Sequence, residues 1–361
     1  MIPEKTETTS VGMQIMSLDE SLAYIDNKLS DRLPYVLLQS RQFGTGPRAN
    51  KLFESLCKVE TDKLIINVDN SARTDFEKHF QPCLEQRNHG ELSIRHGQEK
   101  FSNLPGVKNF VGRNHLRLLM LGEEMMVSTF DLSESCFDRD EMVIRVSDPE
   151  VVQNLKTISM WDFENTHKSW KIKTQKTEII FDCGKDGCSY VSEYINENLP
   201  KHIYKGSEIW IASSWHPDEL EEVLKKAYYQ GGNIKMLINR PNEYESKRKL
   251  PFNLTKWLSA YHFHKDMSKV PCQIFFPKSG QIHAKFLVVD NSKVEGKSSW
   301  WVMGTDNFTR YGSMARTVEL GLADQDGEIT EQLTGYVAKI LRKNNLSPDL
   351  SDVHRTALTN G

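Results

Sequence analysis

The chain has 361 residues, of which 38% are hydrophobic and 26% are charged, and its formal net charge is −3 at pH 7. This composition is ordinary for a globular protein with room for two domains, and the slight negative charge excludes a protein that attracts polyanions over its whole surface. No apolar run approaches the length of a membrane span, and the first residues lack the layout of a signal peptide. The sequence therefore predicts a cytoplasmic protein without an integral membrane segment.

The six cysteines are scattered along the chain, and only Cys183 and Cys188 stand close together. A structural zinc site needs four ligands, and no second close pair completes such a set. We therefore expect reduced thiols, no metal site and no cofactor.

Composition and hydrophobic pattern divide the chain into five segments. A polar N-terminal extension at 1–30 precedes a first half at 31–165, and a polar, basic linker at 166–176 leads to a second half at 177–345. The polar residues 346–361 are predicted to form a frayed C-terminal tail.

The two halves repeat the same order of predicted elements, which is strand, helix, strand. These are 35–40, 48–58 and 64–68 in the first half, and 209–214, 217–230 and 234–238 in the second. Each half then reaches a strand that begins near a histidine. Such a long repeat indicates two copies of one unit, and the alternation of strands and helices indicates an α/β fold with a mixed β-sheet in each.

In both halves a basic residue follows the histidine two positions later. His115 precedes Arg117 in the first half, and His283 precedes Lys285 in the second. Residues two apart in a strand share one face, so an imidazole and a positive charge can lie side by side. This pair suits chemistry on a phosphate, where one group attacks or moves a proton and the other holds negative charge.

Further polar residues follow each pair at matching offsets. In the second half they are Asp290, Thr305 and Asn307, and the pattern resembles the H-x-K-x4-D…G-[ST]-x-N signature of the phospholipase D superfamily. In the first half Gly122 stands in the Asp slot and Asp131 in the Asn slot, so this copy of the motif is degenerate.

The resemblance extends over residues 30 to 345. It implies two phospholipase-D-like α/β sandwich halves, each with a mixed sheet flanked by helices, related by a pseudo-twofold axis. Both histidines are then expected at the cleft between the halves.

For the chemistry, the resemblance implies a metal-independent phosphodiesterase that works through a phosphohistidine. His115 corresponds to the nucleophile and His283 to the acid and base, although the reverse assignment stays open. The residues expected to hold phosphate are Lys285, Arg117 and Asn307. Arginine keeps the positive charge of lysine and adds a two-pronged donor, so it is compatible with this role but not equivalent.

Other residues are expected to support the site. Glu141 and Glu319 match a downstream acid that orients an imidazole through its second nitrogen. Thr305 and Asp290 belong to the intact motif. An ionised Asp131 would repel a phosphate unless it is protonated or turned away.

Nucleic acid, either DNA or RNA, is the favoured substrate, because bacterial members of the superfamily without membrane segments often serve as nucleases in defence or restriction. That substrate requires a local basic groove, for which 247–249 is a candidate. One alternative is a phospholipase D or a cardiolipin-synthase-like phosphatidyltransferase acting on phospholipid. Another is a non-catalytic nucleic-acid-binding subunit of a multi-protein complex. A decayed first motif would instead require a homodimer that joins two second-half motifs.

Overall fold

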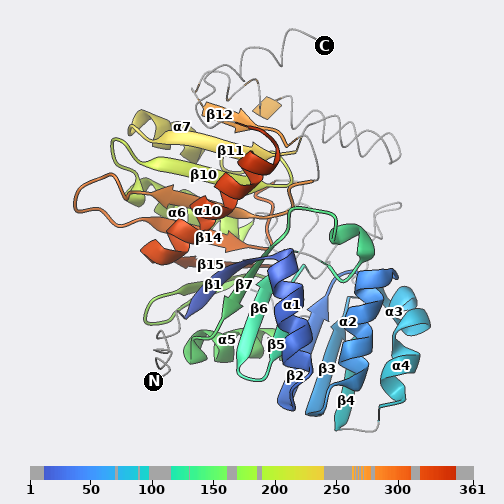
Figure 1. Ribbon diagram of the computed structural model, residues 1–361. Coiled ribbons are helices and arrows are strands. Elements are labelled where there is room, and N and C mark those ends of the chain that lie inside the picture. The colour runs from blue at the N-terminus through green and yellow to red at the C-terminus, as the bar shows by residue number, and fades with distance from the viewer. Residues whose placement is uncertain are drawn as a thin grey trace, which may run out of the picture.

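The computed structural model describes most of the chain and places it in two β-sheets with helices packed on them (Figure 1). The described residues are 12–69, 72–87, 90–96, 115–129, 131–160, 169–184, 189–239, 262–263, 265, 267, 270, 272–277, 281–309 and 318–346. The basic candidate at 247–249 lies outside them.

The first sheet has seven strands in the order β1-β7-β6-β5-β2-β3-β4. Their bounds are β1 (Met13–Ser17), β2 (Leu33–Ser40), β3 (Thr61–Val68), β4 (Glu91–His96), β5 (Leu118–Leu121), β6 (Glu124–Ser128) and β7 (Met142–Val146). The neighbours β2, β3 and β4 are parallel, and the other pairs are antiparallel, so the sheet is mixed as predicted.

The second sheet has eight strands in the order β12-β11-β10-β13-β14-β15-β9-β8. Their bounds are β8 (Trp170–Lys173), β9 (Glu178–Asp182), β10 (Glu208–Ser213), β11 (Asn233–Ile238), β12 (Cys272–Phe275), β13 (Phe286–Asp290), β14 (Trp300–Gly304) and β15 (Glu319–Asp324). Read from β12, this order repeats that of the first sheet read from β4, with β8 as an added edge strand. The predicted repeat and the two α/β halves are confirmed.

Helices cover the outer faces of both sheets. In the first half these are α1 (Leu18–Leu29), α2 (Pro47–Lys58), α3 (Arg73–His79) and α4 (Gln81–Glu85), and in the second α6 (Tyr190–His202) and α7 (Glu221–Tyr229). Their sequences alternate apolar and polar residues at helical spacing: α2 buries Ala49, Leu52, Phe53 and Leu56 on one side. A proline in its first turn suits the start of a helix, where the amide proton has no partner.

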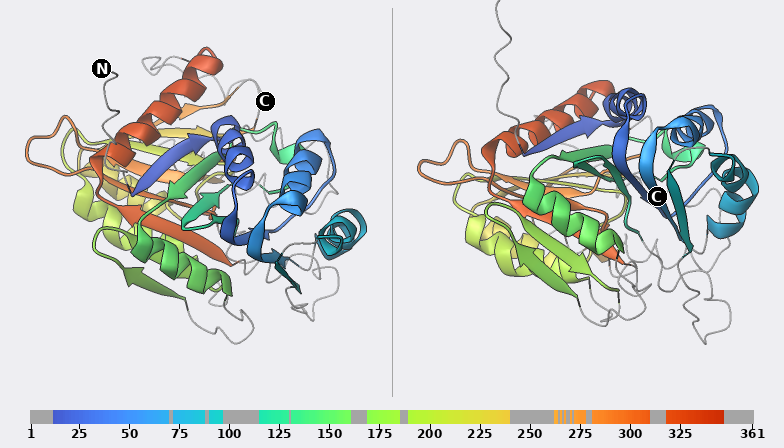
Figure 2. Two further views of the ribbon diagram at one scale, coloured as in Figure 1. Left: turned by 60° about the horizontal axis from the view of Figure 1, so that its bottom comes forward. Right: turned by 90° about the horizontal axis from the view of Figure 1, so that it is seen from below.

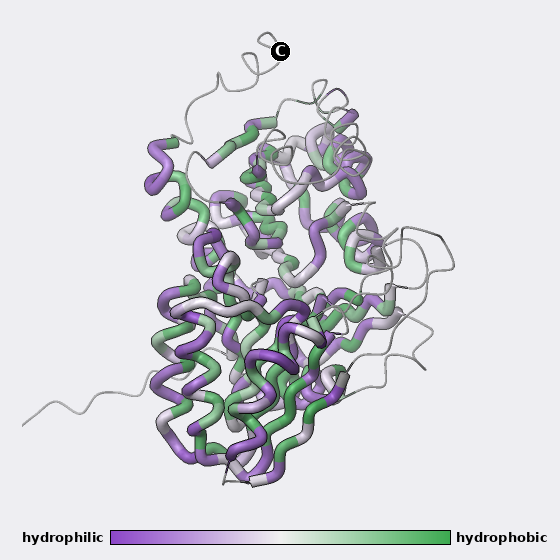
Figure 3. Tube along the Cα trace, turned by 90° about the vertical axis from the view of Figure 1, so that its right-hand side faces the viewer, coloured by the Kyte–Doolittle hydropathy of each residue, from purple (hydrophilic) through white to green (hydrophobic). Residues whose placement is uncertain are grey.

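Two further helices and the inner faces of both sheets form a core that the halves share. These helices, α5 (Pro149–Met160) and α10 (Gly327–Lys343), bury Leu155 and Leu333 in the same hydrophobic cluster as residues of β5 and β13. Figure 2 shows α5 and α10 beside the sheets from two directions, and Figure 3 shows green, hydrophobic stretches of the chain between purple, hydrophilic ones. The shared core fixes the halves relative to each other, and so fixes the site between them.

Three sequence expectations need correction. β1 and α1 lie in the predicted extension at 1–30, yet β1 pairs with β7 and belongs to the first sheet. The described part of the predicted linker at 166–176 contains β8, which pairs with β9. Strands of four or five residues at a sheet edge are too short to show a clear hydrophobic period, which explains both differences.

The third correction concerns the cysteines. Cys57 and Cys83 form a disulfide between α2 and α4, with Cα atoms 6.2 Å apart, so the expectation of reduced thiols is wrong for this pair. None of the described helices combines the length and the apolar character needed to cross a bilayer.

Candidate active site between the two halves

Both predicted histidines lie just before the central strands that pair with β2 and β10. Backbone hydrogen bonds hold each of them to the opposite half. The amide of His115 donates to the carbonyl of Val318 at 2.9 Å, and the amide of His283 donates to the carbonyl of Asp140 at 3.0 Å. The entry to each histidine strand is therefore fixed by the other half of the molecule.

The side chains of the two histidines also pair with residues of the opposite half. Nδ1 of His115 lies 2.6 Å from the carboxylate of Glu319, and Nδ1 of His283 lies 2.8 Å from the carboxylate of Glu141. Each glutamate also accepts a hydrogen bond from a threonine of its own half, Thr305 for Glu319 and Thr129 for Glu141. The histidine side chains are 12% and 15% exposed, so each keeps a small opening toward solvent.

The two histidine–glutamate pairs differ in charge. Burial raises the pKa of Glu319, but the facing His115 and the Thr305 hydroxyl outweigh it and leave the pKa below its ordinary value. Burial also raises the pKa of Glu141, here to about 7. Burial lowers the pKa of both imidazoles, with that of His283 also depressed by Lys285, so both histidines are neutral at pH 7.

Arg117 and Asp131 form a buried ion pair. Nε and Nη2 of Arg117 donate to the two carboxylate oxygens of Asp131 at 2.9 and 3.0 Å, and the side chains are 3% and 2% exposed. Burial alone would raise the pKa of Asp131, but Arg117 and Arg41 hold it below its ordinary value. The carboxylate that should repel substrate is thus ionised and neutralised, and Arg117 is occupied by it.

The second-half residues that are expected to hold phosphate have no acidic partner in the described part of the chain. Lys285 is buried, and its Nζ donates to the carbonyl of His283 at 2.6 Å; burial, followed by the charge of Arg117, lowers its pKa to about 7. Oδ1 of Asn307 is buried and accepts no hydrogen bond from the described residues. Ser213 holds the backbone of Asn307 through a 3.0 Å bond to its carbonyl.

The second half also matches a known family in sequence. Residues 201–341 match the family described as cardiolipin synthase, PLD-like domain. The fold is similar to phosphatidylserine synthase from Haemophilus influenzae, with a TM-score of 0.67 and 10% identity over 92% of this chain and 85% of the synthase. The second half therefore carries a phospholipase-D-like (PLD-like) domain.

Other solved structures share the fold at similarly low identity. Yeast tyrosyl-DNA phosphodiesterase has a TM-score of 0.51 and 9% identity over 87% of this chain and 89% of its own. Polyphosphate kinase from Porphyromonas gingivalis has a TM-score of 0.55 and 10% identity over 91% of this chain and 50% of its own. No curated protein matches this sequence. These likenesses show the phospholipase D fold and leave the substrate open.

One residue of the superfamily signature lies away from the site. Asp290 is the last residue of β13, whereas Lys285 directly precedes that strand, so an extended chain separates the two by roughly 16 Å. Oδ1 of Asp290 accepts from the amide of Ser292 at 2.8 Å and holds the following turn. The prediction of Asp290 as a catalytic residue is therefore wrong. Gly122, at the matching place, occupies a hairpin turn with a φ of 65°.

Sequence reasoning missed Arg41, which follows β2. Its Nη1 lies 2.7 Å from Nε2 of His115, and its Nε lies 3.8 Å from the carboxylate of Asp131. β2 pairs with β5 in the register in which β10 pairs with β13, so Arg41 corresponds to Ser214 in the second half. A charged residue directly after a buried central strand was the available signal, but the superfamily signature does not include this position.

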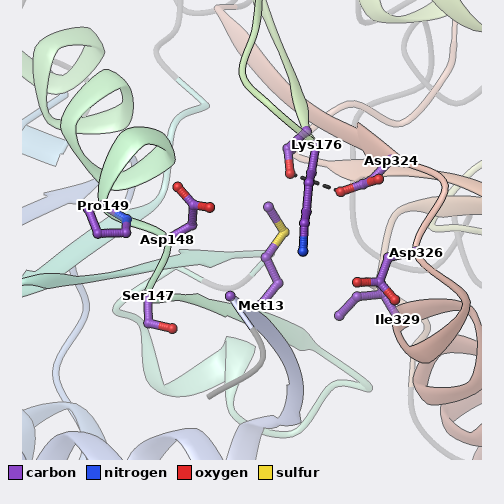
Figure 4. Close-up of a pocket in the computed structure, with 10 residues that line it drawn as sticks. Met13, Ser147, Asp148, Pro149, Lys176, Asp324, Asp326 and Ile329 are labelled. Carbon is purple, nitrogen blue, oxygen red and sulfur yellow. Dashed lines mark hydrogen bonds between the residues drawn. The ribbon is translucent and has the colours of Figure 1, made fainter. Parts of the chain in front are cut away.

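A separate cavity of about 260 Å³ lies at the opposite ends of β7 and β15 from Glu141 and Glu319 (Figure 4). Two of the acidic side chains that line this cavity accept hydrogen bonds from the first turns of helices. Asp148 accepts from the amides at the start of α5, and Asp326 accepts from the amide of Glu328 at the start of α10. Within the described ranges no three histidine, cysteine or acidic side chains are grouped to hold a metal ion.

Asp306, within the signature of the second half, supports a pH-dependence test. It is buried, it accepts hydrogen bonds from Ser189 and from the amide of Phe308, and burial together with Glu319 raises its pKa well above the ordinary value. The folded state therefore retains a proton that the unfolded state loses above about pH 4, so this group destabilises the fold increasingly as pH rises.

We expect Asp306→Asn, which stays neutral and keeps both partners, to gain stability relative to wild type as pH rises. The gain should reach up to about 1.4 kcal/mol per pH unit between pH 5 and the raised pKa. Urea unfolding at about pH 5 and pH 7 measures it, with exposed Asp31→Asn as the matched control. An equal difference between variant and wild type at both pH values would contradict it.

Proposed function

We propose that this protein is a metal-independent phosphodiesterase that forms a phosphohistidine on His115 and uses His283 as acid and base. The observation that carries the proposal is the reciprocal pairing of the two histidines with Glu319 and Glu141 across the halves. A carboxylate on Nδ1 fixes the ring and its tautomer, leaving Nε2 for chemistry. Two imidazoles prepared in this way, beside a buried lysine, fit the two-step cleavage of a phosphate diester.

The contacts of His115 suit the nucleophile. The guanidinium of Arg41 stays protonated and has only donors, so Nε2 of His115 accepts its hydrogen bond and carries the lone pair. Glu319, whose pKa lies below its ordinary value, accepts the proton of Nδ1. This is the neutral tautomer that attack on phosphorus requires.

The reaction follows in two steps. Nε2 of His115 attacks phosphorus, a P–N bond forms, and the P–O bond to the leaving group breaks as His283 donates a proton to that oxygen. His283 then takes a proton from water, whose oxygen attacks phosphorus and releases His115. An anionic phosphate entering the cleft favours the imidazolium of His283, because negative charge raises the pKa of a nearby base.

Nucleic acid is the proposed substrate class. The groups around the histidines are charged or amide side chains, which suit a phosphate backbone. Among the described residues, the large hydrophobic side chain that is strongly exposed is Tyr229, at 77%, on the outer helix α7 rather than near the histidines. Acyl chains would need apolar surface beside the site. A cytoplasmic location and action in bacterial defence remain parts of this proposal.

A second candidate is phosphatidyl transfer, in which an alcohol takes the place of water in the second step. The matched family carries the description cardiolipin synthase, and a structural neighbour is a phosphatidylserine synthase. The same histidines would act, and only the acceptor and the rest of the substrate would differ.

Turnover in EDTA tests both candidates. We expect the wild type to hydrolyse bis(p-nitrophenyl) phosphate and single- or double-stranded DNA or RNA in EDTA, and to lose at least about tenfold of its nucleic-acid activity between about 50 and 200 mM salt. His115→Ala is the inactive control. Headgroup release from phospholipid vesicles without cleavage of nucleic acid would favour the second candidate. Nucleic-acid binding on a gel without cleavage of any substrate would indicate a binding subunit.

A further inference from the structure

The superfamily signature provides one basic residue per half, but the two halves use theirs differently. Lys285 makes no ion pair with any acid in the described ranges, and its one hydrogen bond goes to a backbone carbonyl. Arg117 gives two parallel hydrogen bonds to Asp131. Two of the five N–H donors of Arg117 serve this buried carboxylate, and Nη1 also donates to the carbonyl of His115 at 3.3 Å, so few donors are left for a phosphate and the charge of Arg117 is already balanced. The first half therefore needs another cation.

Arg41 lies where that cation is needed. Its side chain is 19% exposed, whereas that of Arg117 is 3% exposed, so Arg41 is the arginine with access to the opening of the cleft. Nη1 contacts Nε2 of His115, the atom that would attack phosphorus. In the second half the corresponding residue is Ser214, so the first half has a cation at a position where the second half has a hydroxyl group.

We propose that Arg41, rather than Arg117, is the cation of the first half that binds the phosphoryl oxygens of the substrate. The inference rests on the proposed phosphodiesterase activity and names a phosphate-binding residue of that site. An anionic phosphate competes with His115 for the guanidinium, since a charged acceptor forms a stronger hydrogen bond than a neutral imidazole. Arg41 thus moves from Nε2 to phosphate, and the lone pair of His115 becomes free to attack only when substrate is present.

Phosphate affinity tests this assignment without requiring turnover. We expect Arg41→Gln to weaken the binding of inorganic phosphate, measured by calorimetry, by about 10- to 100-fold, the effect of losing one or two charge-assisted hydrogen bonds. Arg41→Lys should lose less, because it keeps the charge but not the two-pronged donor. The comparison is the double variant Arg117→Gln/Asp131→Asn, which removes both charges of the buried pair and should bind phosphate more tightly than Arg41→Gln.

A second readout concerns His115 itself. The charge of Arg41 helps to lower the pKa of this imidazole, so Arg41→Gln should raise that pKa in an NMR titration of labelled histidine. Exposed Arg32→Gln is the control for loss of an arginine and should change neither phosphate binding nor the titration. Circular dichroism confirms that each variant is folded.

The possible results distinguish a failure of the role proposed for Arg41 from a failure of the proposed phosphodiesterase activity. Normal phosphate binding by Arg41→Gln, with loss in the double variant, would return the role to Arg117 and leave the phosphodiesterase proposal intact. A wild type that neither binds inorganic phosphate nor hydrolyses any phosphodiester would overturn both. Weakened binding by Arg41→Gln together with a raised pKa of His115 supports the assignment.

Discussion

A His283→Ala protein is expected to release a single burst of nitrophenolate from bis(p-nitrophenyl) phosphate and then nearly stop, whereas His115→Ala should release none. Nitrophenolate leaves without a proton, so the first step survives the loss of the acid. The second step lacks its base, and steady-state turnover should fall by about 10²- to 10⁴-fold. Loss of the nucleophile removes the covalent route and should cost at least about 10⁴-fold.

Rapid-quench kinetics at high protein concentration measure the burst, and mass spectrometry at alkaline pH locates the adduct on His115. Exposed His79→Ala should leave both phases unchanged. A burst in His115→Ala with none in His283→Ala would reverse the two roles, which the sequence alone left open. A burst in neither variant, beside an active wild type, would rule out a phosphohistidine intermediate.

The largest expected effect on stability comes from Asp131→Ala. It leaves the guanidinium of Arg117 buried without its carboxylate, and breaking a buried ion pair from one side costs about 3–5 kcal/mol of unfolding free energy. Guanidinium chloride unfolding measures this loss. The matched control is Asp62→Ala, because Asp62 and Arg32 form an ion pair at 3.1 Å with side chains 65% and 75% exposed. That exposed pair should contribute less than about 1 kcal/mol.

The double replacement Arg117→Met/Asp131→Leu completes the test. Removing both charges avoids the unpaired guanidinium, so most of the lost stability should return. If Asp131→Ala and Asp62→Ala cost the same, the pair does not act as a buried ion pair in solution. The result also bears on phosphate binding, since a strongly coupled pair leaves Arg117 unavailable to substrate.

The fold could be predicted because the same hydrophobic patterns occur in both halves and belong to strands and helices that are buried. The strand–helix–strand order around 35–68 recurs around 209–238. In each of these elements the apolar residues recur at the spacing of a strand or a helix. The pairs His115 with Arg117 and His283 with Lys285 also stood out, because an imidazole and a cation interrupt an apolar run. Edge strands such as β1 and β8 escaped prediction because they are short and partly polar.

The contacts within the site could not be predicted from spacing. Glu141 and Glu319 were recognised as orienting acids, but sequence offers no sign that each serves the histidine of the other half, since that depends on how the two sheets dock. The pairing of Asp131 with Arg117 required a bidentate geometry that no motif states. Asp290 matched the signature by position, yet the length of β13 carries it away from Lys285.

The exchange of glutamates between the halves has a consequence for the newly made chain. His115 is synthesised 204 residues before the acid that orients it, and His283 depends on Glu141, which is made long before it but lies in the other half. A ribosome-bound first half therefore holds a histidine without its carboxylate. Neither half can orient its own histidine before the other half is present. The proposed hydrolytic activity should therefore begin only when the two halves close on each other, and it should end for both histidines together if they part.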